Sequence, residues 1–200
     1  MGVLLLLFSL SAWLPGTSQT LSDDFIWNAL YPGNRNFISV STWNLSGDSE
    51  GKFLKRRSKN GGKELELHTR IEKIFFFEKA GVRKALVVLF SFEFDERTGL
   101  YVDCNGCSAE YEMAHFSIKN GTWILEKFIQ NWPYSSGVMG GGSELDMKVY
   151  NKTNCLVVTT GYLMRGEYSE VISFYEIETL KLIKMIEKEY NQPRVITNTT

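Results

Sequence analysis

The chain lacks an excess of charge of either sign. Lysine and arginine number 22 and aspartate and glutamate number 23, so the formal net charge is -1. A protein that binds nucleic acid through bulk positive charge needs a surplus of cationic side chains to attract the phosphates. The charge balance therefore argues against this class, and we expect no nucleic-acid partner.

Long apolar runs are missing after residue 14. The uncharged run at 2–14 (GVLLLLFSLSAWL) is shorter than the roughly 20 residues that a membrane-spanning helix needs, and a polar stretch follows it. This pattern is typical of the apolar part of a secretory signal peptide. We expect residues 1–20 to be a signal peptide and residues 21–200 to form one periplasmic or secreted domain with no transmembrane span. The alternative for the run is a buried N-terminal helix or strand.

Cysteine and histidine are scarce, and this limits metal and thiol chemistry. A zinc site takes about four ligands, and beyond Cys104 and Cys107 the chain offers only Cys155, His68 and His115. We expect no metal and no cofactor. In an oxidising compartment the Cys104-x-x-Cys107 pair is best explained as a short-loop disulfide, which leaves Cys155 as a small buried hydrophobic residue. A thiol-redox pair, and a bond from Cys155 to one of the other two cysteines, are the alternatives.

Aromatic residues and alternating patterns are abundant. Aromatics make up 14% of the chain, which favours pleated, half-buried surfaces. Residues 64–71 alternate strictly and place Leu65, Leu67, Thr69 and Ile71 on one face of a strand. The apolar run 85–90 is typical of a central strand, and further strands are expected at 37–41, 74–77, 147–150, 155–160, 170–177 and 181–186. Ser22 is a candidate N-cap for a short helix that Pro32-Gly33 ends.

A hairpin and a weak internal repeat define the fold class. Asn120-Gly121 separates the alternating runs 110–118 and 122–129, which predicts a β-hairpin. The pattern of 85–129 recurs at 155–186, and each unit reads as a three-stranded meander. We therefore expect an all-β protein of antiparallel meanders, forming a sandwich or a strongly curved sheet with some likeness to propeller blades, with a short N-terminal helix. Residues 178–190 also fit helical spacing, and residues 44–63 are polar and read as a loop or mobile hairpin.

Two segments are candidates for recognition. Trp132 and Tyr134 lie in an expected loop beside the glycine-rich stretch 137–143, and exposed loop aromatics are used in binding. The alternative is that they pack as a lid over the end of a sheet. The basic segment 52–63 is expected to be a solvated hairpin tip, and its alternative role is weak contact with an anionic surface.

The region 85–177 resembles a family of uncharacterised bacterial exported proteins. The matching residues are the apolar strand 85–90, Cys104-x-x-Cys107, the arm Gly121-Thr122-Trp123-Ile124-Leu125-Glu126 and the aromatic, glycine-rich loop at 131–142. This chain has Ala109 where the family often has proline. The resemblance implies a location in the cell envelope, and it brings no catalytic residue with it.

The sequence thus favours a binding or interaction module of the cell envelope over an enzyme, with an unidentified protein or small ligand as its partner. It shows no catalytic motif, and we assign no catalytic residue. Two alternatives are an envelope hydrolase whose active site is assembled only on folding, and a thiol-redox protein that uses Cys104 and Cys107.

Overall fold

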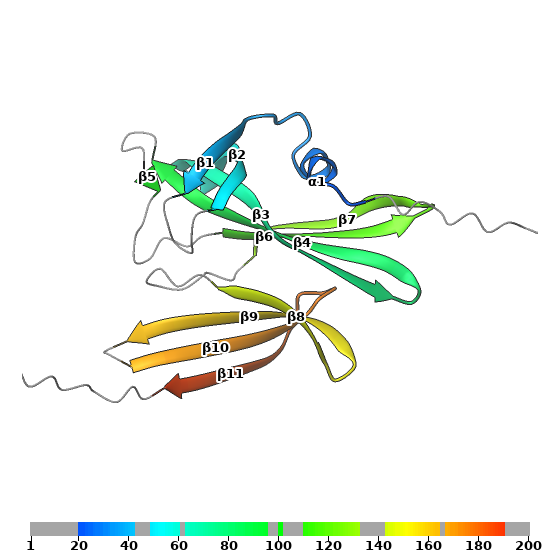
Figure 1. Ribbon diagram of the computed structural model, residues 1–200, viewed down its shortest axis with the longest axis vertical. Coiled ribbons are helices and arrows are strands. Elements are labelled where there is room, and N and C mark those ends of the chain that lie inside the picture. The colour runs from blue at the N-terminus through cyan, green and yellow to red at the C-terminus, as the bar shows by residue number, and fades with distance from the viewer. Residues whose placement is uncertain are drawn as a thin grey trace, which may run out of the picture.

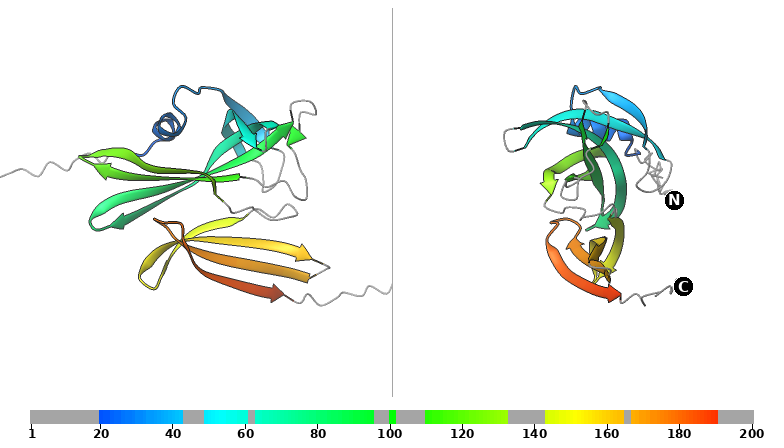
Figure 2. Two further views of the ribbon diagram at one scale, coloured as in Figure 1. Left: turned by 180° about the vertical axis from the view of Figure 1, so that it is seen from behind. Right: turned by 90° about the vertical axis from the view of Figure 1, so that its left-hand side faces the viewer.

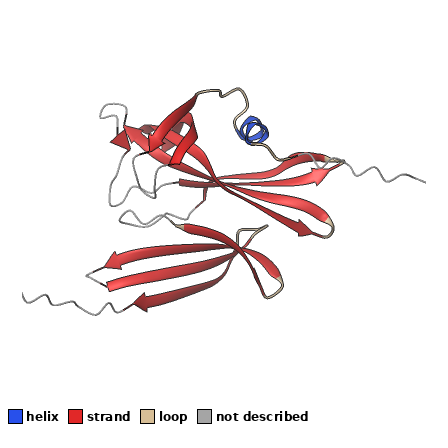
Figure 3. Cartoon of the chain, viewed as in Figure 1, coloured by secondary structure: helices blue, strands red, loops and turns tan. Residues whose placement is uncertain are grey.

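The computed structural model describes residues 20–42, 49–60, 63–95, 100–101, 110–132, 143–164 and 167–190. Over these ranges the chain forms one helix and eleven strands in two antiparallel sheets (Figure 3). The predicted antiparallel all-β fold with a short N-terminal helix is confirmed. The elements are α1 (Asp23–Leu30), β1 (Phe37–Thr42), β2 (Ser49–Asn60), β3 (Lys63–Lys79), β4 (Val82–Asp95), β5 (Leu100–Tyr101), β6 (Glu110–Lys119), β7 (Thr122–Trp132), β8 (Glu144–Tyr150), β9 (Thr153–Met164), β10 (Glu167–Glu176) and β11 (Leu182–Tyr190).

Both sheets are meanders of strands that follow one another in the chain. The seven-stranded sheet runs β1-β2-β3-β4-β6-β7, with β5 paired to the end of β4, and the four-stranded sheet runs β11-β10-β9-β8. The two units of the weak sequence repeat correspond to β4-β6-β7 and β9-β10-β11.

Three of the hairpins close with two-residue turns in which both residues have positive φ. Such turns match the right-handed twist of the flanking strands, so they favour asparagine and glycine. The predicted Asn120-Gly121 hairpin is confirmed. The turn residues and their φ values are Ala80 (50°) and Gly81 (74°), Asn120 (52°) and Gly121 (77°), and Asn151 (47°) and Lys152 (65°).

The molecule has three layers, with the seven-stranded sheet in the middle. α1 lies on one face of this sheet and the four-stranded sheet lies on the other (Figures 1 and 2). Side chains alternate along β4, so Val87 packs with the helix residue Ile26, while Val88 packs with Leu156 of β9. The two sheets are also joined by a hydrogen bond, in which Lys73 Nζ of β3 donates over 2.6 Å to the backbone carbonyl oxygen of Leu145 in the edge strand β8.

A β-bulge divides β3 between the two cores. Ile71 pairs with Leu89 and Lys73 pairs with Val88, so Glu72 is the extra residue. Before the bulge Ile71 faces the helix, and after it Phe75 and Phe77 face the four-stranded sheet. The first half of β3 alternates as predicted. The one inserted residue then moves the odd-numbered side chains from the helix face of the sheet to the opposite face.

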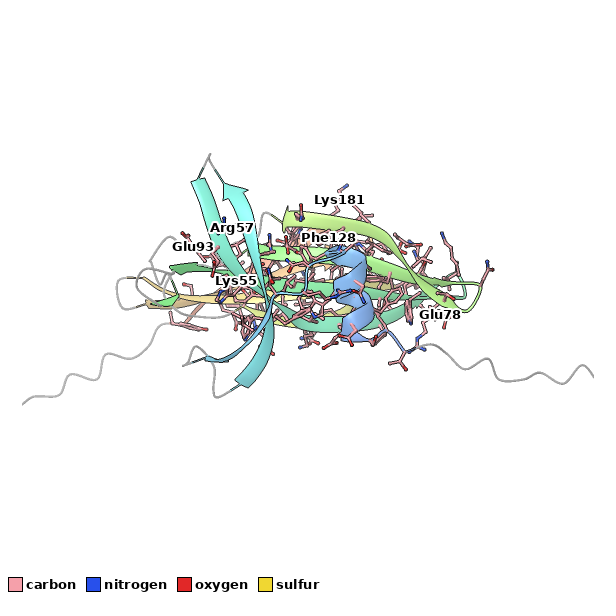
Figure 4. All side chains as sticks on the ribbon, turned by 90° about the horizontal axis from the view of Figure 1, so that it is seen from above. Lys55, Arg57, Glu78, Glu93, Phe128 and Lys181 are labelled. Carbon is pink, nitrogen blue, oxygen red and sulfur yellow. The ribbon has the colours of Figure 1, made fainter. Side chains whose placement is uncertain are left out.

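The predicted start and end of α1 are confirmed. The Phe25 backbone N–H donates to Ser22 Oγ over 3.3 Å, which satisfies one of the donors left open at a helix start. The helix gives way at Tyr31, and Pro32-Gly33 follows with Gly33 at a φ of 82°. The axis of α1 lies across the strands of the seven-stranded sheet, and Phe128 of β7 is close to the helix (Figure 4).

The structure decides two segments for which the sequence left alternatives open. Residues 49–60 of the predicted loop form β2, because pairing with β3 and burial of Phe53 and Leu54 outweigh the polar composition. Residues 182–190 form β11, so the strand expected at 181–186 is confirmed and the helical alternative for 178–190 is wrong. Leu180, Ile183 and Ile186 fit either period, and pairing with β10 decides the outcome.

Candidate functional site

The structure places Trp132 in the core. It is the last residue of β7, pairs with Tyr111, and its ring lies 4.8 Å from that of Tyr175 in the four-stranded sheet. Only 7% of its surface is exposed, so it contributes to packing between the sheets. Tyr134, Cys104 and Cys107 lie outside the described residues. Cys155 is a free, buried cysteine, as its position at the start of an apolar strand predicted.

The basic segment contributes an arginine to a buried polar cluster on the helix face of the seven-stranded sheet. We call this group, formed by Tyr31, Arg56, Thr69, Ser91 and Glu112, the polar cluster. Arg56 of β2 donates to Thr69 Oγ1 over 2.8 Å and to Ser91 Oγ over 3.1 Å, and its guanidinium lies 3.0 Å from the Glu112 carboxylate. The cluster therefore spans the four adjacent strands β2, β3, β4 and β6.

α1 is connected to the polar cluster through Tyr31. The Tyr31 hydroxyl donates a short hydrogen bond to Glu112 Oε2, and its ring lies 5.6 Å from the Arg56 guanidinium carbon. Glu112 and Thr69 are fully buried, and Arg56 is 9% exposed. A buried ion pair is costly to desolvate, so the additional hydrogen bonds matter to its stability. The cluster therefore links the end of the helix to four strands of the sheet.

The sequence interpretation missed Glu112, although a signal was present. Glu112 shares a strand face with Ala114 and Phe116, which are both apolar. A carboxylate on an otherwise apolar strand face indicates a buried, paired acid. Its partner Arg56 was hidden within a segment whose composition resembled a loop.

His115 lies on the opposite face of β6, between the sheets. Its Nε2 is 2.7 Å from the backbone carbonyl oxygen of Ile177, and its buried Nδ1 has no hydrogen-bond partner among the residues that the structure describes. The carbonyl can only accept, so Nε2 carries the proton. Burial lowers the pKa of His115, and Lys127 and Lys84 lower it further, against the opposing effects of Ile177 and Glu126. The neutral ring thus acts as a link between the two sheets.

His68 lies beside a carboxylate, which is the arrangement that a hydrolase would use. Its Nε2 is 3.2 Å from Glu66 Oε1, while Lys55 Nζ is 2.8 Å from Glu66 Oε2. The His68 and Glu66 side chains are only 3% and 8% exposed. The lysine and the histidine share the Glu66 carboxylate. We therefore interpret the group as a structural ion pair on the face of β3 away from α1.

Metal and membrane features are absent from the described part of the chain. Within it, no three His, Cys, Asp or Glu side chains are grouped to hold a metal ion. Nor does it contain a helix that is both long and apolar enough to cross a membrane.

The most unusual surface is the edge strand β11. Leu182 and Met185 are on the face of this strand that points towards the seven-stranded sheet, yet they are 47% and 62% exposed. Figures 1 and 2 show why: β11 is the strand of its sheet that lies farthest from the seven-stranded sheet. No described strand pairs with its outer edge. Ile183, the extra residue of a bulge opposite Phe174 and Tyr175, is 43% exposed.

Charge distinguishes the two faces of β11. Lys184 and Lys188 are exposed on the face opposite to Leu182 and Met185. Natural edge strands usually carry charges or bulges that prevent pairing with other chains. β11 has a bulge at its start, and from Lys184 onwards it is regular and carries the charges of Lys184, Glu187 and Lys188 around Met185 and Ile186. This edge could accept an added strand.

Comparison with known proteins finds no relative of this chain: no family model, no curated protein and no solved structure matches it.

Proposed function

We propose that this protein is an exported binding module of the cell envelope that captures an extended polypeptide segment along the edge of β11. Export is supported by the apolar run at 2–14 and by the expected Cys104–Cys107 disulfide. The observation that carries the proposed activity is the exposed Met185, which lies on an edge strand whose outer backbone groups have no described partner.

The chemistry of β11 indicates what kind of segment it would take. An added strand forms backbone hydrogen bonds along the edge, and its alternate side chains lie beside the two faces of β11. One face offers Leu182, Met185 and Glu187, and the other offers Lys184 and Lys188, with Lys188 lying 3.5 Å from Glu170. A segment that alternates apolar and acidic residues would satisfy both faces.

The test uses the full chain and two synthetic octapeptides, one alternating valine with glutamate and one alternating valine with lysine. Calorimetry measures binding, and amide NMR shifts locate it. We expect the acidic peptide to bind with shifts centred on β11, and the lysine peptide to bind at least about tenfold more weakly, because it meets Lys184 and Lys188. No binding of the acidic peptide, or shifts centred elsewhere, would rule out the proposal.

A matched pair of variants completes the test. Met185→Lys places a charge on the proposed edge, and Val149→Lys makes the same change on β8, the other edge strand of the sheet. Both positions are well exposed, so each change should alter the free energy of unfolding by less than about 0.5 kcal/mol. Only Met185→Lys should weaken binding. An equal loss in Val149→Lys would mean that binding is not specific to β11.

A second candidate is an envelope hydrolase, and the His68–Glu66 pair is the observation in its favour. His68→Gln would abolish hydrolysis of ester and amide substrates if His68 acts as a general base. Unchanged activity in that variant, or no activity in the parent chain, would remove this candidate.

A further inference from the structure

Three hairpin turns gather at one end of the molecule. The β3–β4, β6–β7 and β8–β9 turns point the same way in Figures 1 and 2, and Figure 4 places Glu78 at this end and Lys55 and Glu93 at the other. We call residues 78–84, 118–123 and 148–153 the tip surface. Each of its turns is only two residues long, so the surface is held by the sheets behind it.

The tip surface is basic, although the chain as a whole is not. It contains six lysine or arginine residues against one acid, Glu78. Glu178 forms ion pairs with Lys79 and Lys84, Glu126 lies 3.3 Å from Lys84, and Asp146 lies 3.4 Å from Lys148. Lys119 and Lys152 are exposed, and Lys119 is near enough to Glu126 to help lower the pKa of that carboxyl. An excess of positive charge therefore remains at this end.

Apolar side chains accompany these cations. Val149 is 70% exposed and Val82 is 37% exposed, and each lies within three residues of a turn. Exposed valines gain nothing from a polyanion such as a polysaccharide sulfate. They gain from entering the boundary between headgroups and acyl chains, where cations also find phosphate.

The backbone at Lys152 offers a way to separate binding from stability. Its φ of 65° is in the left-handed region, where glycine is favoured and a residue with a Cβ costs stability. Lysine stands at the turn position that glycine fills in the other two turns. Glycine at this position should therefore relieve strain while removing the charge.

We propose that the tip surface docks onto an anionic phospholipid membrane. Lys119 and Lys152 would contact lipid phosphates, and Val82 and Val149 would enter the interface between headgroups and acyl chains. The proposal is independent of strand capture by β11.

Vesicle co-sedimentation tests the proposal with the full chain. The readout is the ratio of binding to phosphatidylglycerol vesicles over phosphatidylcholine vesicles. Any vesicle binding by the apolar run at 2–14 is common to all variants, so it cancels when the variants are compared. We expect strong preference for the anionic vesicles, lost at high salt. Lys119→Gln with Lys152→Gln should lower the ratio about tenfold or more, since each cation near the surface contributes about fivefold. Lys184→Gln with Lys188→Gln removes the same charge from β11 and should leave the ratio unchanged.

Two further variants separate binding from folding and lipid from polyanion. Lys152→Gly should raise the unfolding temperature while lowering vesicle binding, which no folding defect could produce. Val82→Ser with Val149→Ser should weaken vesicle binding and leave heparin binding unchanged. Equal losses in the β11 control would overturn the proposal, as would vesicle binding that is indifferent to the two valines.

Discussion

The imidazole Nε2 of His115 donates a hydrogen bond of 2.7 Å to the backbone carbonyl oxygen of Ile177. This bond joins β6 of the seven-stranded sheet to the turn that leads from β10 to β11. It is one of few polar contacts between layers that otherwise meet through apolar side chains. A second proton on the ring would go to Nδ1, which is buried and has no hydrogen-bond partner among the described residues. The charged ring is therefore disfavoured at this position.

Acid should weaken the protein through His115. Burial holds its pKa in the folded chain below the ordinary value of 6.5, so the unfolded chain binds the proton first as pH falls. The stability contributed by the neutral ring is complete above about pH 6.5 and is lost as the pH falls through the folded-state pKa. Urea unfolding across this range should show a steeper decline for the parent chain than for His115→Gln. Identical slopes would contradict this account.

The ion pair in the polar cluster should show strong coupling. Glu112→Leu and Arg56→Met each leave a buried polar group without its charged partner and should cost about 3–5 kcal/mol. The double variant Arg56→Met with Glu112→Leu should cost less than the sum of the single changes by about 1 kcal/mol or more. Chemical denaturation of the four proteins measures the coupling, and additive losses would show that the two side chains act independently.

The β3–β4 turn offers a paired test of backbone strain. Ala80 and Gly81 both have positive φ and both are exposed, and nothing lies within 4 Å of a Cβ built at Gly81. Ala80→Gly should therefore stabilise the protein by up to about 1 kcal/mol, and Gly81→Ala should destabilise it by a similar amount. Thermal unfolding of the two variants checks the signs. A destabilised Ala80→Gly would show that strain in this turn is negligible.

Cysteine labelling addresses Cys155 and the expected disulfide together. Burial raises the pKa of the Cys155 thiol, and its Sγ donates to the backbone carbonyl oxygen of Thr153 over 3.4 Å. The native protein should therefore resist alkylation at this residue near neutral pH. Under denaturing, non-reducing conditions one thiol per chain should react, as read by mass spectrometry. Three reactive thiols would exclude a Cys104–Cys107 disulfide.

The sequence predicted the elements whose patterns are local. The Ser22 cap, the alternation at 64–71 and the Asn120-Gly121 turn each depend on residues within a few positions of one another, and all three are present in the fold. β2 was missed because its burial comes from strands and a helix that only folding brings together. Composition made Arg56 look solvated, whereas its partners lie on β3, β4 and β6.

The candidate surfaces were harder to predict for the same reason. Met185 looks like an ordinary apolar strand residue, and only its place on an edge strand far from the other sheet explains its exposure. Lys119 and Lys152 are 33 residues apart in the chain. They lie at the same end of the molecule only because the two sheets stack with these turns pointing the same way (Figure 1). Trp132 illustrates the converse, because an aromatic residue predicted in a loop instead fills the space between sheets.

The bulge at Glu72 has a consequence for how the protein comes apart. Because β3 supplies side chains to the helix core before the bulge and to the inter-sheet core after it, neither core can loosen without disturbing the same strand. The layers should consequently melt in a single cooperative transition, with one midpoint whether the signal comes from α1 or from β10. A cut at Ser143 would then yield two halves that do not fold separately, since each would leave its half of the shared interior open to water.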